Sequence, residues 1–273
     1  MQDDQGLLKD SIHDFWNEKS CGEVYATGTT LKEQLEHQEA ERYRLEPQIF
    51  RFADFAGGAG KDVLEIGVGM GADHLQWARA RPRTLAGIDL TERGIDFTRH
   101  RLSIYGLSSD LRVADAENLP FAADSFDIVY SYGVLHVSPD TPRTVREVFR
   151  VLKPGGVAKV LIYHKWSMVG YMLWVRYGLL ALRPFRGLSD IYAEHLESPG
   201  TKAYTISEAR ELFSQFRSVD IHIELGFGDL LQGEVGQRHR GILLRMAKAL
   251  WPRWFIRRVM TKHGMGMFIT AVK

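Results

Sequence analysis

The sequence contains a single cysteine, Cys21, so an intramolecular disulfide is excluded and no cysteine cluster can bind zinc. Positive and negative side chains nearly balance, and a formal net charge of +1 gives no overall attraction to nucleic acid. The first ten residues carry three acids and one lysine, unlike the basic and apolar start of a secretory signal. These absences lead us to expect a cytoplasmic protein with no nucleic-acid partner.

Long uninterrupted apolar runs are also missing. The two most apolar stretches, 166–185 and 241–260, both contain arginine, so an integral membrane protein is not expected. No internal repeat, low-complexity tract or flexible linker divides the chain. A length of 273 residues therefore suits one doubly wound domain with insertions better than two independent domains.

The most informative stretch that is present lies at residues 62–71. Its apolar first half reads as a buried strand, and Gly67, Gly69 and Gly71 follow directly. Glycines permit a sharp turn and let the backbone approach a ligand closely. A second apolar run ends in Asp89, and an acid at that place can accept hydrogen bonds from both ribose hydroxyls of an adenosine. Together these features predict a nucleotide-binding turn.

The glycine spacing and Glu65 indicate which nucleotide binds. A dinucleotide fingerprint reads G-x-G-x-x-G, whereas here x-G-x-G-x-G follows an acid that would repel a pyrophosphate and favour a cation. At this point the chain resembles the class I S-adenosylmethionine-dependent methyltransferases of the small-molecule type, whose first motif is E/D-x-G-x-G-x-G. The resemblance covers residues 60–163, and its other motifs lie at 87–90, 114–121, 126–131 and 152–156.

The resemblance implies S-adenosylmethionine as the cofactor and assigns its contacts by motif position. The three glycines would pass under the ribose and methionine, with Glu65 fixing the turn or meeting the ammonium group. Asp89 would bind the ribose hydroxyls, and Asp115 would accept from the adenine amino group. The other motif positions expected at the cofactor are Leu90, Ala116, Glu117 and Ser131. In the N-terminal segment, Tyr25 is expected nearest the methionine, unless it only packs this segment onto the sheet.

A general base is expected just beyond the fourth strand, where the carboxyl ends of a parallel sheet form the site. His136 lies there, and a histidine can take a proton from a hydroxyl near neutral pH. Many of the resembling enzymes carry histidine at this position, often doubled, whereas here Val137 follows. His136 is therefore the candidate base, with lining of the active site as its alternative role. Weaker candidates are Tyr132, Tyr163, His164 and His195, and no metal site is expected.

The pattern of apolar and turn residues predicts an α/β fold with a doubly wound, mostly parallel seven-stranded sheet. The resemblance implies that this sheet ends in an antiparallel edge strand and carries an N-terminal helical cap and a helical insertion. The predicted strands are 62–66, 84–88, 110–113, 126–130, 156–163, 219–225 and 267–272. Helices are predicted at 72–80, 91–105 and 141–152, with Thr91 as an N-cap and Thr205 with Glu208 as a capping box. The predicted parts are a cap at 1–56, a cofactor-binding core at 57–163, a lid insertion at 164–204, and a C-terminal completion at 205–273.

Two apolar stretches outside the motifs carry the information on substrate. Residues 166–185 suggest a lid over a hydrophobic or aromatic acceptor, a packed cover, or a helix at a membrane interface. Residues 241–260 alternate apolar and basic side chains, which suits a packed helix or a peripheral contact with an anionic membrane. We therefore expect methyl transfer to a small hydrophobic or aromatic acceptor, with oxygen ahead of nitrogen or carbon. The alternatives are methylation of a lipid or quinone-like acceptor at a membrane surface, and a cofactor-binding module without turnover.

Overall fold

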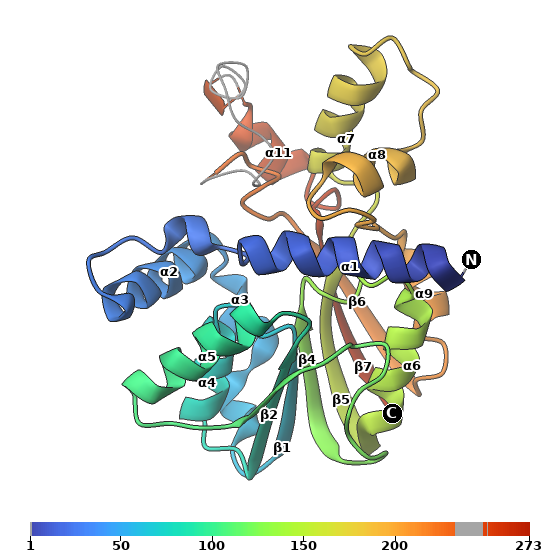
Figure 1. The fold of residues 1–273 in the computed structure, drawn as a ribbon. Helices are drawn as coiled ribbons and strands as arrows, with labels where there is room; N and C mark the ends of the chain where they lie inside the picture. The colour runs from blue at the N-terminus through green and yellow to red at the C-terminus, as the bar shows by residue number, and fades with distance from the viewer. Residues whose placement is uncertain (1, 233–247, 250) are drawn as a thin grey trace.

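A computed structural model describes residues 2–232, 248–249 and 251–273 of the protein, in which one sheet lies between two layers of helices (Figure 1). The strands follow the order β3-β2-β1-β4-β5-β7-β6. Their bounds are β1 Asp62–Ile66, β2 Thr84–Asp89, β3 Asp110–Val113, β4 Phe126–Tyr132, β5 Leu152–Tyr163, β6 Ser218–Glu224 and β7 Gly266–Val272. Strand β7 is antiparallel to both β5 and β6, and the other neighbouring pairs are parallel. The predicted seven-stranded fold is confirmed, and its antiparallel strand is inserted next to the edge rather than at it.

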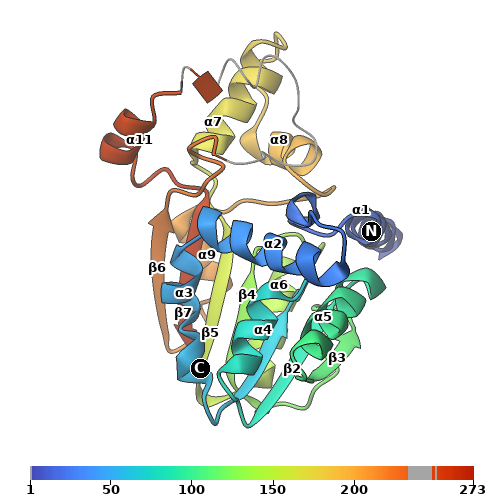
Figure 2. The same ribbon diagram turned by 90° about the vertical axis from the view of Figure 1, so that its left-hand side faces the viewer.

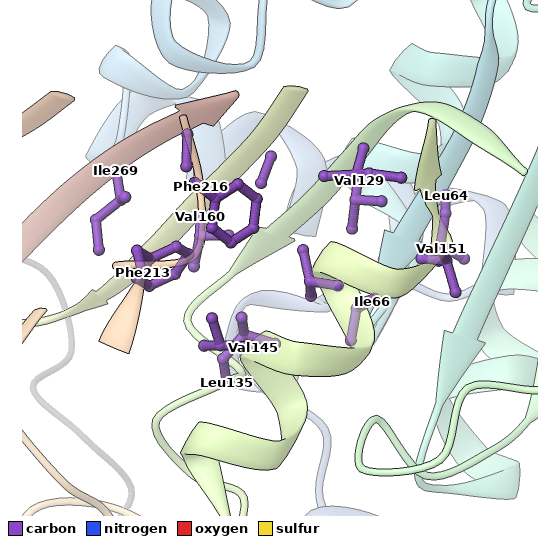
Figure 3. Close-up of a cluster of buried hydrophobic side chains, with 14 of the residues drawn as sticks. Leu64, Ile66, Val129, Leu135, Val145, Val151, Val160, Phe213, Phe216 and Ile269 are labelled. Carbon is purple, nitrogen blue, oxygen red and sulfur yellow. The ribbon is translucent and has the colours of Figure 1, made fainter. Parts of the chain in front are cut away.

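The central strands are buried on both faces because their side chains alternate between two cores. Leu64 and Ile66 of β1 point into a cluster with Val145 and Phe213, from helices on one face of the sheet (Figure 3). Val63, one position away, belongs to the cluster on the other face. Continuous burial of this kind is typical of a parallel sheet covered on both sides.

Helices cover the two faces as the alternation of strands and helices predicts. On the Val63 face lie α3 Gln48–Ala53, η2 Phe55–Gly58, α4 Ala72–Arg79 and α5 Glu92–Ile104, with α2 Leu31–Leu45 packed outside them. On the other face lie α6 Thr141–Val151 and α9 Ile206–Leu212. This two-sided cover leaves the carboxyl ends of the parallel strands as the place for a site.

The element ends follow the signals in the sequence with one exception. The Thr91 hydroxyl accepts from the Gly94 amide at 3.1 Å, and Thr205 forms the predicted capping box with Glu208. The fifth strand, predicted to begin at 156, begins instead at Leu152. The reason is that Leu152 already pairs with Phe126 of β4 before the turn residues interrupt the ladder.

Two further parts stand at the carboxyl end of the sheet. Helix α1 Gln2–Glu18 lies across this end and is followed by η1 Glu23–Tyr25 (Figure 1). Farther out stand α7 Met168–Trp174, the π-helical turn η3 Val175–Leu179, α8 Leu188–His195 and α11 Arg253–Val259 (Figures 1 and 2). Of the predicted basic segment 241–260, residues 241–247 and 250 lie outside the described residues.

Candidate cofactor and acceptor site

One cavity opens at the carboxyl ends of β1, β2, β4 and β5 and contains most of the residues singled out in the sequence. Its wall includes the turn after β1, the loops after β2 and β3, and part of the loop after β6. Helix α1 and residues 20–21, which follow it, form a further part of the wall. The lining from these parts includes Glu65, Gly67, Gly69, Gly71, Asp89, Leu90, Asp115, Ala116, Tyr132, Tyr163, Phe227 and Asp229.

The glycine turn has the shape of a cradle. Gly67 adopts a φ of 80°, and a Cβ built there would lie 2.2 Å from Cγ2 of Val134, so no other residue fits. Gly69, with a φ of 50°, faces open space, so a side chain at this position would extend into the cavity. The Gly69 amide donates to the Asp89 carboxylate at 2.9 Å, which holds the turn against the tip of β2. The backbone of the glycine turn and the Asp89 carboxylate therefore lie side by side at the cavity. This arrangement suits an adenosine, whose ribose hydroxyls can donate to the carboxylate.

Glu65 lies at the cavity wall and is fixed from behind. Its carboxylate is 3.0 Å from Nδ1 of His74, whose Nε2 lies 2.7 Å from the Ser109 hydroxyl. Burial lowers the pKa of His74 to about 3, so the ring is neutral and can donate one proton, which suits the carboxylate. Burial also raises the pKa of Glu65, and the nearby Asp73 adds to this rise. A cationic ligand at this wall would stabilise the Glu65 carboxylate.

A partly buried arginine ties the helical cap to the helix that follows the glycine turn. Arg42 of α2 donates to both carboxylate oxygens of Asp73, at 2.9 and 2.6 Å. The phenols of Tyr130 and Tyr43 donate to the same carboxylate at 2.8 and 3.0 Å. Burial opposes ionisation of Asp73, but the Arg42 charge and these donors lower its pKa.

A second arginine, which is fully buried, reaches the glycine turn itself. Arg101 of α5 donates to the Met70 carbonyl at 2.7 Å and to the Leu35 carbonyl of α2 at 3.0 Å. It also contacts the side chains of Gln38 at 2.6 Å and Glu39 at 2.9 Å. No sequence motif marks either arginine, because their partners lie 30 to 70 positions away. Their shared role is to hold α2 and the turn in one position.

One stripe of α1 forms the opposite wall. Lys9, Ile12 and Trp16 recur at the spacing of a helix face, and all three line the cavity. The Lys9 ammonium contacts the carboxylates of Asp115 and Glu117, each at 2.6 Å. Two ion pairs therefore join the N-terminal helix to the loop that carries Asp115 and Glu117.

Ser20, just after α1, also lines the cavity. It is buried, and its hydroxyl has no hydrogen-bond partner within the described part of the chain. Because a buried hydroxyl without a partner is costly, a ligand that supplies one would be stabilised here.

Three of the predicted cofactor contacts do not line this cavity. Tyr25 lies in η1 outside the cavity, because α1 extends to Glu18 and the turn at 20–21 already fills the wall. Ser131 is fully buried and donates to the Ile66 carbonyl at 3.2 Å, so it joins β4 to β1. Glu117 is absent from the lining and accepts from Lys9, Ser138 and the Asp140 amide, so it holds loops together.

The far end of the cavity carries two tyrosine–carboxylate pairs. The Tyr132 phenol donates to Glu46 at 3.0 Å, and the Tyr163 phenol donates to Glu197 at 2.9 Å. Burial raises the pKa of Glu197; the Tyr163 hydrogen bond opposes this shift and the charge of Glu46 adds to it. Cys21 faces the same space and is exposed.

His136 does not reach this space, contrary to its predicted role as base or lining. Its ring is completely buried and does not belong to the cavity wall. It packs against the Tyr163 ring, with centroids 4.0 Å apart, and neither ring nitrogen has a hydrogen-bond partner among the described residues. Burial, together with the charge of Lys202, lowers the pKa of His136 to about 3. Tyr163, which lines the cavity, thus packs directly against the histidine.

Two of the weaker candidates for the general base also lie outside the cavity lining. His164 is buried and lies 3.2 Å from the Gly264 carbonyl, and His195 stacks on Tyr177, so neither lines the cavity. Glu197 was missed because it lies in a turn after α8 that no motif marks.

The predicted lid at 166–185 contributes no described residue to the cavity wall. Instead Val169 and Leu173 of α7 pack with Leu188, Ile191 and Tyr192 of α8 in a small core of their own. The described residues contain no group of three or more histidine, cysteine or acidic side chains that could hold a metal ion. Nor does any helix in the described ranges have the length and apolar character needed to span a membrane.

Comparison with known proteins agrees with this geometry. Residues 64–160 match the family described as a methyltransferase domain. They form a class I S-adenosylmethionine-dependent methyltransferase domain. The match begins within β1 and ends within β5, so the methyltransferase domain includes the turn, Asp89 and Asp115.

Two relatives are similar over this methyltransferase domain. The chain is 40% identical over 99 residues to a phthiotriol/phenolphthiotriol dimycocerosates methyltransferase of Mycobacterium leprae, covering 36% of each chain. It is 40% identical over 123 residues to a fatty-acid O-methyltransferase of Mycolicibacterium smegmatis, covering 44% of this chain and 43% of that relative. The similarity therefore spans less than half the length of either relative.

A solved structure extends the likeness of fold beyond the methyltransferase domain. An S-adenosylmethionine-dependent methyltransferase from Mesorhizobium loti superposes with a TM-score of 0.53, over 83% of this chain and 97% of that one. The sequence identity is 16%, so this similarity concerns the fold.

Proposed function

We propose that this protein transfers a methyl group from S-adenosylmethionine to a hydroxyl oxygen of a hydrophobic acceptor. The observation that carries the proposal is the Tyr163–Glu197 pair, which faces the same cavity as the glycine turn. The proposal has three parts: a cofactor at the turn, an acceptor beside it, and Glu197 as the base.

The cofactor part rests on the residues around the turn. Gly67 and Gly69 leave room for the ligand, Asp89 faces the ribose position, and Asp115 with Ala116 lines the adenine side. When bound, S-adenosylmethionine supplies a methyl carbon that its sulfonium makes electrophilic. The protein then has to orient a nucleophile and accept one proton.

The acceptor part rests on the order of the strands. Tyr163 ends β5, which neighbours β4, and β4 neighbours the strand that carries the turn. With strands about 4.8 Å apart, Tyr163 stands about 10 Å from the turn, measured across the sheet. Leu161, Phe227 and Phe268 line the space around this end, which suits an apolar acceptor.

The chemistry of the acceptor follows from charge. Glu46 and Glu197 both face the cavity, so an acceptor that carries a carboxylate of its own would be repelled. A hydroxyl group has no such cost and can donate to Glu197. Burial raises the pKa of Glu197 toward neutrality, which makes the ionised group a better base. The hydroxyl proton would pass to Glu197 as the O–CH₃ bond forms and the S–CH₃ bond breaks.

The test is transfer of labelled methyl groups to two probes of the same shape, para-nonylphenol and para-nonylbenzoic acid. We expect the phenol to be methylated and the acid to react at least tenfold more slowly. Glu197→Gln should reduce phenol turnover about 10²–10³-fold while S-adenosylhomocysteine affinity stays within twofold. Glu194→Gln, an exposed position on α8, is the matched control. Binding of S-adenosylhomocysteine without transfer to either probe would instead support a binding module.

A further inference from the structure

The part of the molecule farthest from the sheet carries an unusual set of exposed apolar side chains. Between α7 and α8, Leu180 is 71% exposed, Leu182 89% and Phe185 fully exposed. On α11, Trp254 is 77% exposed and Phe255 48%. Both segments stand at the same end of the molecule (Figures 1 and 2). We call these five side chains the projecting apolar surface; an apolar surface of this kind marks a contact with an apolar partner.

Basic side chains flank the projecting apolar surface, while the acids of this end, Asp190 and Glu194, lie on α8, where Glu194 pairs with Arg186. No acid occurs between Lys165 and Ser189, whereas Arg176 and Arg183 are exposed there. The described residues from 248 onward contain no acid either, and Arg257 and Arg258 of α11 are exposed. The exposed cations beside these apolar side chains favour a partner with an apolar interior and an anionic surface.

A second cavity extends this positive region toward the site. Its described lining contains four cations, Arg44, Lys248, Arg253 and Arg257, and no carboxylate. It shares Gln48, Gly226 and Phe227 with the cofactor and acceptor cavity. An anionic group held at these cations would lie directly beside the space proposed for the acceptor.

One buried carboxylate connects the projection to the cavity wall. Asp229 lines the cavity and accepts from the amides of Gly226 at 2.9 Å, Met265 at 2.8 Å and Val169 of α7 at 3.3 Å. Its carbonyl accepts from the indole of Trp251, just before α11, at 2.9 Å. The bases of α7 and α11 are thus fixed to the same loop that forms the acceptor wall.

We propose that the projecting apolar surface binds an anionic lipid bilayer. The exposed leucines, Phe185 and Trp254 would enter the boundary between headgroups and acyl chains, and the arginines would meet the anionic headgroups. This interaction surface goes beyond methyl transfer and does not depend on it. It places the acceptor cavity next to a lipid phase.

The experiment is co-sedimentation of the full chain with vesicles of phosphatidylcholine alone or with about one third phosphatidylglycerol. We expect at least tenfold stronger binding to the anionic vesicles, and loss of most of this preference at about 0.5 M salt, where charges are screened. The triple variant Leu180→Ser, Leu182→Ser and Phe185→Ser should bind at least tenfold more weakly. The control variant Leu31→Ser, Phe50→Ser and Ile206→Ser removes exposed apolar groups from other elements and should bind like the natural chain.

Three results would overturn the proposal. The first is equal binding to neutral and anionic vesicles, or none to either. The second is an equal loss in the triple variant and its control. The third is a dimer of the natural chain that the triple variant dissociates, measured by light scattering without vesicles, because a second copy would then cover this surface. Thermal melts of both variants check that they fold.

Discussion

The Tyr163 phenol donates to the carboxylate of Glu197 across 2.9 Å, while the Tyr163 ring rests on the buried ring of His136. One side chain therefore separates a carboxylate inside the cavity from a histidine behind its wall. The proton acceptor proposed from this geometry is the carboxylate, and the histidine supports the tyrosine from behind.

The first prediction concerns the pH dependence of turnover. Glu197 must be ionised to accept a proton, and its pKa is raised, so the rate should rise with pH through a value above that of an ordinary glutamate and then level off. Glu197→Gln should remove this rise from the remaining activity. Rates of methyl transfer across pH 4.5–8.5 measure both profiles. If the rate of the variant still rises with pH in the same range, the ionisation belongs to another group.

The second prediction concerns His136 and folding stability. In the folded state its pKa is about 3, so between that value and about 6.5 the unfolded chain binds a proton that the folded chain does not. Its contribution to stability is therefore present above pH 6.5 and lost as the pH falls. His136→Phe should remove this loss. When the pH is lowered from 7 to 5, the free energy of unfolding of the natural chain should therefore fall by about 2 kcal/mol more than that of the variant. Urea unfolding at both values tests this, and His136→Leu should show the same trend.

The same variant separates support from catalysis. If His136 acts only through packing, His136→Phe retains most of the methyl transfer at pH 7.5. A loss of more than about a hundredfold with intact cofactor affinity would restore the histidine as a participant in proton transfer.

The third prediction concerns Asp89. Removing a carboxylate expected to bind two ribose hydroxyls should weaken S-adenosylhomocysteine binding by about 1.5–3 kcal/mol, roughly ten- to a hundredfold. Calorimetry on Asp89→Ala measures this, with Asp96→Ala, an exposed acid of α5, as control. Equal affinity in both variants would exclude Asp89 from the site, and tight NAD binding by the natural chain would refute the cofactor assignment.

The fourth prediction concerns the buried Arg101. Arg101→Met removes donors to the Met70 carbonyl, α2 and the Glu39 carboxylate, so it should lower the free energy of unfolding by about 3–5 kcal/mol. Chemical denaturation gives the value. Arg99→Met, an exposed position on the same helix, should change it by less than about 0.5 kcal/mol. A small effect at Arg101 would mean that α2 is held mainly by apolar contacts.

The fifth prediction concerns the link between α1 and the cofactor motif. Lys9→Met leaves Asp115 and Glu117 without their shared ammonium. Because the pair is partly exposed, the loss should be about 1 kcal/mol, which makes dissociation of S-adenosylhomocysteine roughly fivefold faster. Stopped-flow displacement measures this rate. Lys32→Met, exposed on α2, should leave it unchanged, and an unchanged rate in Lys9→Met would show that α1 does not retain the cofactor.

The sheet and the cofactor turn could be predicted from the sequence because their signals are local. The glycines follow β1 directly, and Asp89 ends β2, so spacing alone predicts which residues meet at one edge. Thr91 and Thr205 likewise cap helices whose first turns follow them in sequence.

The acceptor end could not be predicted, because it is assembled from distant segments. Glu197 follows α8, Cys21 follows α1, and Phe227 follows β6, and no spacing rule relates them. The placement of His136 could not be predicted for a related reason: its position beyond β4 predicts proximity to the site, but the side of Tyr163 on which the ring lies depends on packing.

The α1 wall has a kinetic consequence. One side of the ligand space belongs to a helix joined to the cofactor motif through Lys9, and the sheet does not depend on that helix for its pairing. Exchange of a ligand through this wall requires α1 to move, whereas methyl transfer within the closed cavity does not. The first methyl group should then be transferred in a burst, followed by slower steady turnover set by departure of S-adenosylhomocysteine.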